Sequence, residues 1–150
     1  MKVVLQRVSE AAVSIDQQTK SEIGNGLVLL LGIAPEDTNT DIDWLCQKIS
    51  KLRIFADKAD RMNLSALDVD AEILVVSQFT LYANVKKGTR PSFVQAAPPA
   101  IAIPLYEAFV AKMNSVMGKT VQTGTFGADM KVQLVNDGPV TIILDSQNKG

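Results

Sequence analysis

Hydrophobic positions at the start of the chain follow the spacing of β-strands. The segment VVLQRVSEAAVSI mixes β-branched residues with partial alternation, and a GNG turn at 24–26 precedes the apolar run LVLLLGI at 27–33. A continuous apolar run of this length is typical of a strand buried on both faces. We therefore expect the first 33 residues to form β structure.

Two later segments have the apolar spacing of helices. The first follows PEDTNT at 35–40, which contains candidate N-caps, and should end near 53–55. The second covers 103–118, with Pro104 in its first turn and Gly118 at its C-terminal end. Between the helices, EILVVSQFTLYA at 72–83 predicts a strand, and two or three short strands should close the chain.

The resulting order is β-rich, α, β, α, β-rich, without the regular alternation of a doubly wound fold. It predicts an α+β domain with a mostly antiparallel sheet and two main helices. At 150 residues the chain should form one domain, 1–150, with a flexible polar tail at 145–150.

Composition narrows the possible chemistry. The chain has no histidine, which excludes Ser-His-Asp and Cys-His triads and removes the commonest zinc ligand. Its single cysteine, Cys46, cannot form an internal disulfide and lies in a helical pattern, so we expect a buried thiol. Hydrolytic chemistry would have to use carboxylates, hydroxyls, backbone N–H groups or the substrate itself.

Charge and hydropathy bear on location and partners. The N-terminus lacks the apolar stretch of a signal peptide, and no apolar run is long enough to span a bilayer, so we expect a cytoplasmic protein without a membrane partner. The net charge of −1 lacks the basic surplus usual in nucleic-acid binders. An RNA partner would need a local basic patch, for which Lys86, Lys87 and Arg90 are candidates.

The segment SQFT, residues 77–80, places polar groups at the end of a very apolar strand. Ser77, Gln78 and Thr80 could satisfy backbone groups there, or they could belong to an active site held by the strand. No residue in the sequence obviously activates Thr80 as a nucleophile. Backbone N–H groups at such a strand end could instead form an oxyanion hole.

Two glycine-containing segments are open to more than one interpretation. In TGTFGADM (123–130), the glycines could allow close approach to a ligand or could form bulges and turns. In NDGPVTI (136–142), Gly138-Pro139 could be a tight turn between two strands, or a unit whose backbone carbonyls project for use.

Taken together, these segments resemble the D-aminoacyl-tRNA deacylase family, also called D-tyrosyl-tRNA deacylases. The resemblance runs from residue 5 to 144, and SQFTL with NDGPVT is its most specific part. It implies a homodimer of compact β-barrel-like subunits that hydrolyses the ester of D-aminoacyl-tRNA. It implies no cofactor, no metal and no DNA partner.

The resemblance also implies roles for particular residues. Gly138-Pro139 would be a cis unit that enters the partner subunit's active site, holds the substrate amino group and excludes L side chains, with Arg7 orienting it. Such a filter should admit glycine, so Gly-tRNA is an expected second substrate. The ester would lie near four residues at the strand end: Ser77, Gln78, Phe79 and Thr80. The pocket would be shaped by four others: Phe126, Gly127, Ala128 and Met130.

Two points remain open at this stage. Thr80 could be the nucleophile, or the 2′-hydroxyl of the terminal adenosine could assist water, and the lack of histidine favours the second. Family members usually carry Lys or Arg where this chain has Thr125, which leaves more of the RNA contact to Lys86, Lys87 and Arg90. The alternatives to a deacylase are a non-catalytic RNA-end binding module and a general esterase that uses Thr80.

Overall fold

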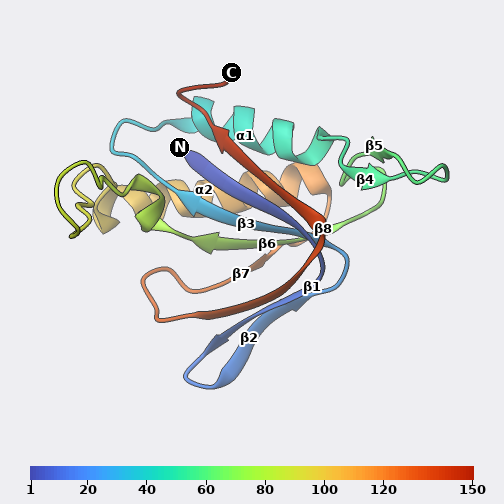
Figure 1. Cartoon of the computed structure of the whole chain (residues 1–150), viewed down its shortest axis with the longest axis horizontal. Helices are drawn as coiled ribbons and strands as arrows, with labels where there is room; N and C mark the ends of the chain where they lie inside the picture. Colours follow the sequence, from blue (N-terminus) through green and yellow to red (C-terminus); the bar gives the residue numbers. More distant parts are fainter.

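The computed structural model describes all residues from 1 to 150. One mixed sheet holds strands β1 (Lys2–Ile15), β2 (Gln18–Ile23), β3 (Gly26–Gly32), β6 (Glu72–Ser77), β7 (Gln122–Thr123) and β8 (Lys131–Asp145). The helices are α1 (Asn39–Lys51) and α2 (Pro99–Met117), and a small hairpin joins β4 (Phe55–Ala56) to β5 (Met62–Leu64). The predicted α+β class with two main helices is confirmed (Figure 1).

The sheet curves until it nearly closes. β1 pairs antiparallel with β2, β3 and β8, while β3–β6 and β6–β7 are parallel. The Ser21 hydroxyl on β2 donates to the Thr123 carbonyl on β7 at 2.6 Å, across the remaining gap. The barrel-like arrangement is therefore confirmed, with a parallel element at its centre.

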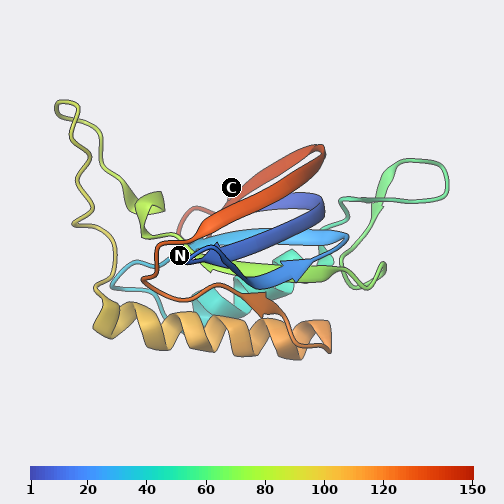
Figure 2. The same ribbon diagram turned by 90° about the horizontal axis from the view of Figure 1, so that it is seen from below.

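The continuous apolar runs are explained by two hydrophobic clusters on opposite faces of β3 and β6. Leu27, Leu29 and Leu31 join the larger cluster beneath the helices, whereas Val28 faces the smaller cluster inside the curved sheet. Both helices lie on one side of the sheet, and β8 is the strand farthest from them (Figure 2). No helix is both long and apolar enough to cross a membrane.

The predicted helices need one correction. α1 begins after the N-cap Thr38 and α2 ends at Gly118, which has a left-handed φ of 67°. However, α2 begins at Pro99, so Pro104 lies inside the helix and not in its first turn. Pro104 is tolerated because it is exposed, and water can reach the carbonyl of Ala100 that it leaves without a helical partner.

Two strand predictions were also wrong in detail. The strand predicted over 72–83 ends at Ser77, and residues Phe79–Tyr82 form a 3-10 helix, η1. The two strands predicted around Gly138 are one long strand, β8, which pairs with β1 on both sides of the Gly-Pro unit. Within the segment predicted as a tail, Asp145 ends β8 and Ser146 is buried, with its N–H donating to the Met1 carbonyl at 2.9 Å.

Cys46 is fully buried, as expected, and its thiol lies 3.8 Å from the Phe109 carbonyl. Burial raises the pKa of this thiol to about 12. We therefore expect the folded protein to react very slowly with a maleimide or disulfide reagent at pH 8, because the thiolate is the reactive form. Mass spectrometry should find one adduct only after unfolding in denaturant. Rapid labelling of the folded protein would contradict this placement.

Candidate functional site

The candidate site lies where β6 ends and η1 begins. The Gln78 N–H donates to the Leu31 carbonyl at 2.7 Å, which ends the parallel pairing with β3. The first hydrogen bond of the following turn runs from the Leu81 N–H to the Gln78 carbonyl at 3.2 Å. The N–H groups of Phe79 and Thr80 therefore precede the first bonded turn and are available to an acceptor.

A small pocket of about 60 Å³ opens beside this turn. Its walls are Leu31, Ile33, Ser77, Gln78, Phe79, Ala97, Ala102, Phe126 and Gly127. Residues 77–79 and 126–127 were selected from separate motifs, and the fold brings them to one place. Ligand pockets that enclose a whole small molecule are usually at least about 300 Å³, so this pocket can hold only a small group.

The side chains around the pocket include no obvious base. The Gln78 amide donates to the Thr80 hydroxyl at 2.5 Å, and a donating amide does not remove a proton from Thr80. Tyr106, whose ring contacts Phe126, donates to the Val75 carbonyl at 3.2 Å, and burial raises its pKa to about 12. Tyr106 therefore stays neutral at physiological pH.

The predicted basic residues lie on the loop that follows η1. Lys86, Lys87 and Arg90 line a hollow of about 230 Å³ together with Asn84 and Ser92. The loop closes through paired N–H to carbonyl bonds between Asn84 and Ser92, at 2.8 and 2.9 Å. It is joined to the pocket by Phe93, whose ring meets Phe79 edge-on at 5.2 Å. The cations thus lie on an extension of the pocket rim, which Figure 2 shows protruding from the body.

Gly138 and Pro139 lie elsewhere. They form an exposed bulge in β8: Gln6 pairs with Thr141 and Val8 with Asn136, so residues 137–140 all lie opposite Arg7. The peptide bond between them is cis. This bulge accounts for the proline, because no strand hydrogen bond is required from that position.

Three side-chain contacts brace the bulge. Arg7 donates through Nε to the Asp137 carbonyl at 2.9 Å and through Nη1 to the Ile54 carbonyl at 2.6 Å. Asn136 accepts from the Val140 N–H at 2.7 Å and spans the neck of the bulge. The contacts of Asn136 and Ile54 were not predicted, since the sequence shows neither the bulge nor what lies beside it.

Strand register measures how far the bulge is from the pocket. Arg7 aligns with Leu27 and Ile73, whereas Ser77 aligns with Leu31. The two sites are therefore four residues apart along the strands, about 13 Å, and three strands apart across the sheet, about 14 Å. Along the sheet, the Gly-Pro unit and the pocket of one chain are therefore well separated.

Two further predicted residues do not line the pocket. Met130 packs against the smaller hydrophobic cluster, beside Gly124. Ala128 closes a turn, with its N–H donating to the Thr125 carbonyl at 3.2 Å. Both follow the pocket residue Gly127 closely in sequence, which is why the motif grouped them together.

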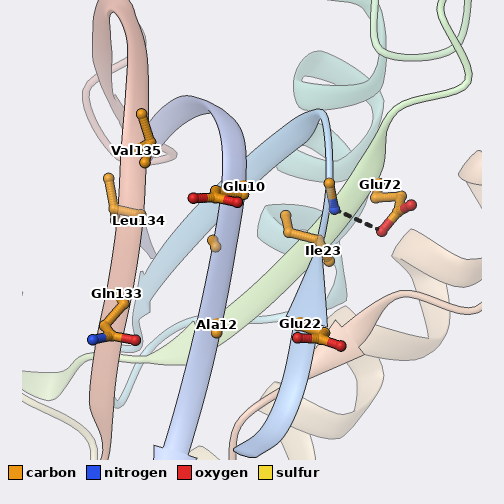
Figure 3. A pocket seen from close by; sticks show the side chains of 10 residues that line it. Glu10, Ala12, Glu22, Ile23, Glu72, Gln133, Leu134 and Val135 are labelled. Atoms are coloured by element: carbon orange, nitrogen blue, oxygen red, sulfur yellow. Dashed lines mark hydrogen bonds between the residues drawn. The ribbon is translucent and has the colours of Figure 1, made fainter.

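Another hollow, of about 690 Å³, lies on a different face and is acidic. Glu10, Glu22 and Glu72 line it, and Glu72 accepts from the Gly24 N–H at 3.1 Å (Figure 3). These carboxylates do not form a cluster that could hold a metal ion. An anionic substrate would be repelled here, so the smaller pocket remains the candidate.

Comparison with known proteins gives a consistent result. The sequence model of the D-Tyr-tRNA(Tyr) deacylase family matches residues 4–145. The chain is 59% identical to a D-aminoacyl-tRNA deacylase of Flavobacterium psychrophilum and 58% identical to one of Parabacteroides distasonis, over 99% of each chain.

Solved structures agree with the fold. A structure of a c-Myc DNA unwinding element binding protein superposes with a TM-score of 0.92 at 41% identity, covering 97% of this chain and 98% of that one. A probable eukaryotic D-amino acid tRNA deacylase superposes with a TM-score of 0.85 at 17% identity, covering 95% of this chain and 97% of that one, which shows a shared fold.

Proposed function

Since the chain belongs to the D-Tyr-tRNA(Tyr) deacylase family and is a D-aminoacyl-tRNA deacylase, a hydrolase, we propose that it works as a homodimer with shared active sites. In this arrangement the Gly138-Pro139 bulge of one subunit enters the pocket beside Ser77 of the other. The observation that carries the proposal is the separation of bulge and pocket within one chain. The Gly138-Pro139 unit is exposed and is held in place by Arg7 and Asn136, which suits a role in contacting a partner subunit.

Selection between D and L esters would be made by main-chain groups. The carbonyls of Gly138 and Pro139 accept hydrogen bonds from the substrate ammonium and so fix the orientation of its α-carbon. An L side chain would then be directed into backbone, whereas a D side chain would point away from it. Glycine has no side chain to exclude, so Gly-tRNA is a second expected substrate. The small pocket supports this, because it does not enclose a side chain and need not select one D-amino acid.

Hydrolysis would proceed through a tetrahedral intermediate. Water attacks the ester carbonyl carbon, and the negative charge on its oxygen is stabilised by the N–H groups of Phe79 and Thr80. The bond to the ribose oxygen then breaks, and that oxygen takes a proton, which releases free D-amino acid and tRNA. The neighbouring 2′-hydroxyl of the terminal adenosine orients the water and relays its proton, since the site has no evident protein base.

Substitution of Thr80 tests this assignment. We expect Thr80→Ala to keep single-turnover deacylation of D-Tyr-tRNA within about tenfold of the unaltered protein, because its hydroxyl only accepts a bond from Gln78. Removing a true nucleophile would lower the rate by more than about 10⁴-fold. In parallel, D-Tyr-tRNA ending in 2′-deoxyadenosine should react about 100-fold more slowly. A loss of more than about 10⁴-fold in Thr80→Ala, together with an unchanged rate on the 2′-deoxy substrate, would establish Thr80 as the nucleophile and favour the general esterase.

A further inference from the structure

A second basic surface lies at the C-terminal end of α1. Trp44, Lys48, Lys51 and Arg53 surround a hollow of about 480 Å³, with Gln47 and Leu52 completing its wall. We refer to these four residues as the α1 basic surface. No acidic side chain lines the hollow, although Asp and Glu outnumber Lys and Arg by 16 to 15 in the chain. A surface free of carboxylates is therefore notable in this protein.

The lysines of this surface form no ion pair, whereas Arg53 donates through Nε to the Asn63 carbonyl at 2.9 Å and its charge contributes to lowering the pKa of Asp68. None of the four ion pairs in the structure includes Lys48, Lys51 or Arg53. The Trp44 ring makes cation–π contacts with two lysines: the ammonium of Lys48 lies 5.8 Å from the ring centre and that of Lys149 lies 4.9 Å from it. The helix dipole accounts for lysines in the last turn of α1, but not for Arg53 beyond its end or for Lys149 from the C-terminus.

This surface adjoins the Gly-Pro bulge. Arg53 immediately precedes Ile54, whose carbonyl accepts from the same Arg7 guanidinium that holds Asp137. Figure 1 shows this end of α1 beside β4 and β5, near the start of β6, whereas β6 runs away from it and ends at Ser77. The α1 basic surface is thus on the side of the chain that would face a partner's pocket.

We propose that the α1 basic surface binds the phosphate backbone of the tRNA whose aminoacyl end occupies the partner subunit's pocket. The inference rests on the proposed shared site: as the bulge enters that pocket, the adjoining cations come to the place where the RNA leaves it. Lys48 and Lys51, which form no ion pair on this open surface, complement phosphodiester groups. The tRNA would then be held from both subunits, by this surface and by the loop with Lys86, Lys87 and Arg90 of the subunit that supplies the pocket.

The first test neutralises two lysines. We expect Lys48→Gln/Lys51→Gln to raise the KM for D-Tyr-tRNA about tenfold at moderate salt, with kcat unchanged and the salt dependence of binding reduced by about 1 to 2 in log–log slope. The control is Lys20→Gln/Lys119→Gln, which removes the same charge outside this surface, in Lys119 from an ion pair with Asp70, and should leave KM unchanged. An unaltered KM in the first variant, or an equal rise in the control, would overturn the proposal.

Mixed dimers test the contact across subunits. If one subunit carries Gly138→Ala/Pro139→Ala, only its own pocket remains active, completed by its partner's bulge. Adding the lysine substitutions to the partner should raise KM, whereas adding them to the same subunit should not. An effect in the same subunit alone would overturn the proposal. Loss of deacylation without any subunit dependence would instead count against the shared site, so the two failures can be told apart.

Discussion

Gly138→Ala is expected to lower kcat/KM for D-Tyr-tRNA on the order of 100-fold, the usual effect of displacing a positioning group by about 1 Å. Gly138 has a φ of 147°, a backbone conformation that L side chains rarely adopt. An added Cβ would lie only 2.8 Å from the Val140 nitrogen, which is main chain and cannot move away as a side-chain end would. The carbonyls of the bulge would therefore be redirected, and rejection of the L ester should weaken together with the rate.

A matched glycine controls for loss of stability. Gly118 also has a positive φ, 67°, but it ends α2 and an added Cβ would meet nothing within 4 Å. Gly118→Ala should lower the melting temperature without changing the ratio of D to L hydrolysis. If Gly138→Ala kept the full rate and the full ratio, the bulge could not be the selecting element.

Arg7→Ala is expected to have the second large effect, on both activity and stability. Its guanidinium holds the Asp137 and Ile54 carbonyls at 2.9 and 2.6 Å, and so ties the bulge to the segment after α1. Losing two hydrogen bonds from a charged donor should cost about 2–4 kcal/mol of unfolding free energy. Deacylation of D-Tyr-tRNA should fall on the order of 100-fold under conditions where the variant is fully folded.

Two comparisons separate positioning from folding. Arg7→Lys should recover some stability but little activity, because one ammonium cannot replace the two-pronged contact. Arg61→Ala, which removes an exposed guanidinium, should change neither quantity. Denaturant unfolding and single-turnover deacylation measure the two effects. Full activity in Arg7→Ala would mean that the bulge needs no such support.

The elements that could be predicted from sequence are those fixed by local patterns. The β-rich start, both helices and the buried strand at 27–33 follow from apolar spacing, since β3 and β6 are covered on both faces. The end of β6 could not be predicted, because FTLY continues the apolar pattern while the chain turns into η1. The choice between a tight turn and a projecting unit at Gly138-Pro139 could not be made from sequence for a related reason: turn-forming residues also form bulges, and only the pairing with β1 distinguishes them.

Some residues of the candidate site could be predicted from sequence motifs, and others could not. Residues 77–79 and 126–127 were selected by motif, and the fold brings them together at the pocket. Met130 and Ala128 were grouped with them by the family resemblance, but the structure packs Met130 against a different cluster. The contact of Asn136 with Val140 depends on the shape of the bulge. The position of Lys149 over Trp44 depends on residues far apart in the chain. A local sequence pattern predicts neither contact.

The most direct test of the account is deacylation of matched D-Tyr-tRNA and L-Tyr-tRNA by the purified protein, followed as loss of labelled ester in single turnovers. We predict rapid hydrolysis of the D ester, with the L ester spared by at least about 100-fold, because the L side chain would meet backbone of the partner's bulge. Equal cleavage of both esters would contradict selection by main chain. Tight binding of tRNA without cleavage of either ester would contradict the hydrolase itself.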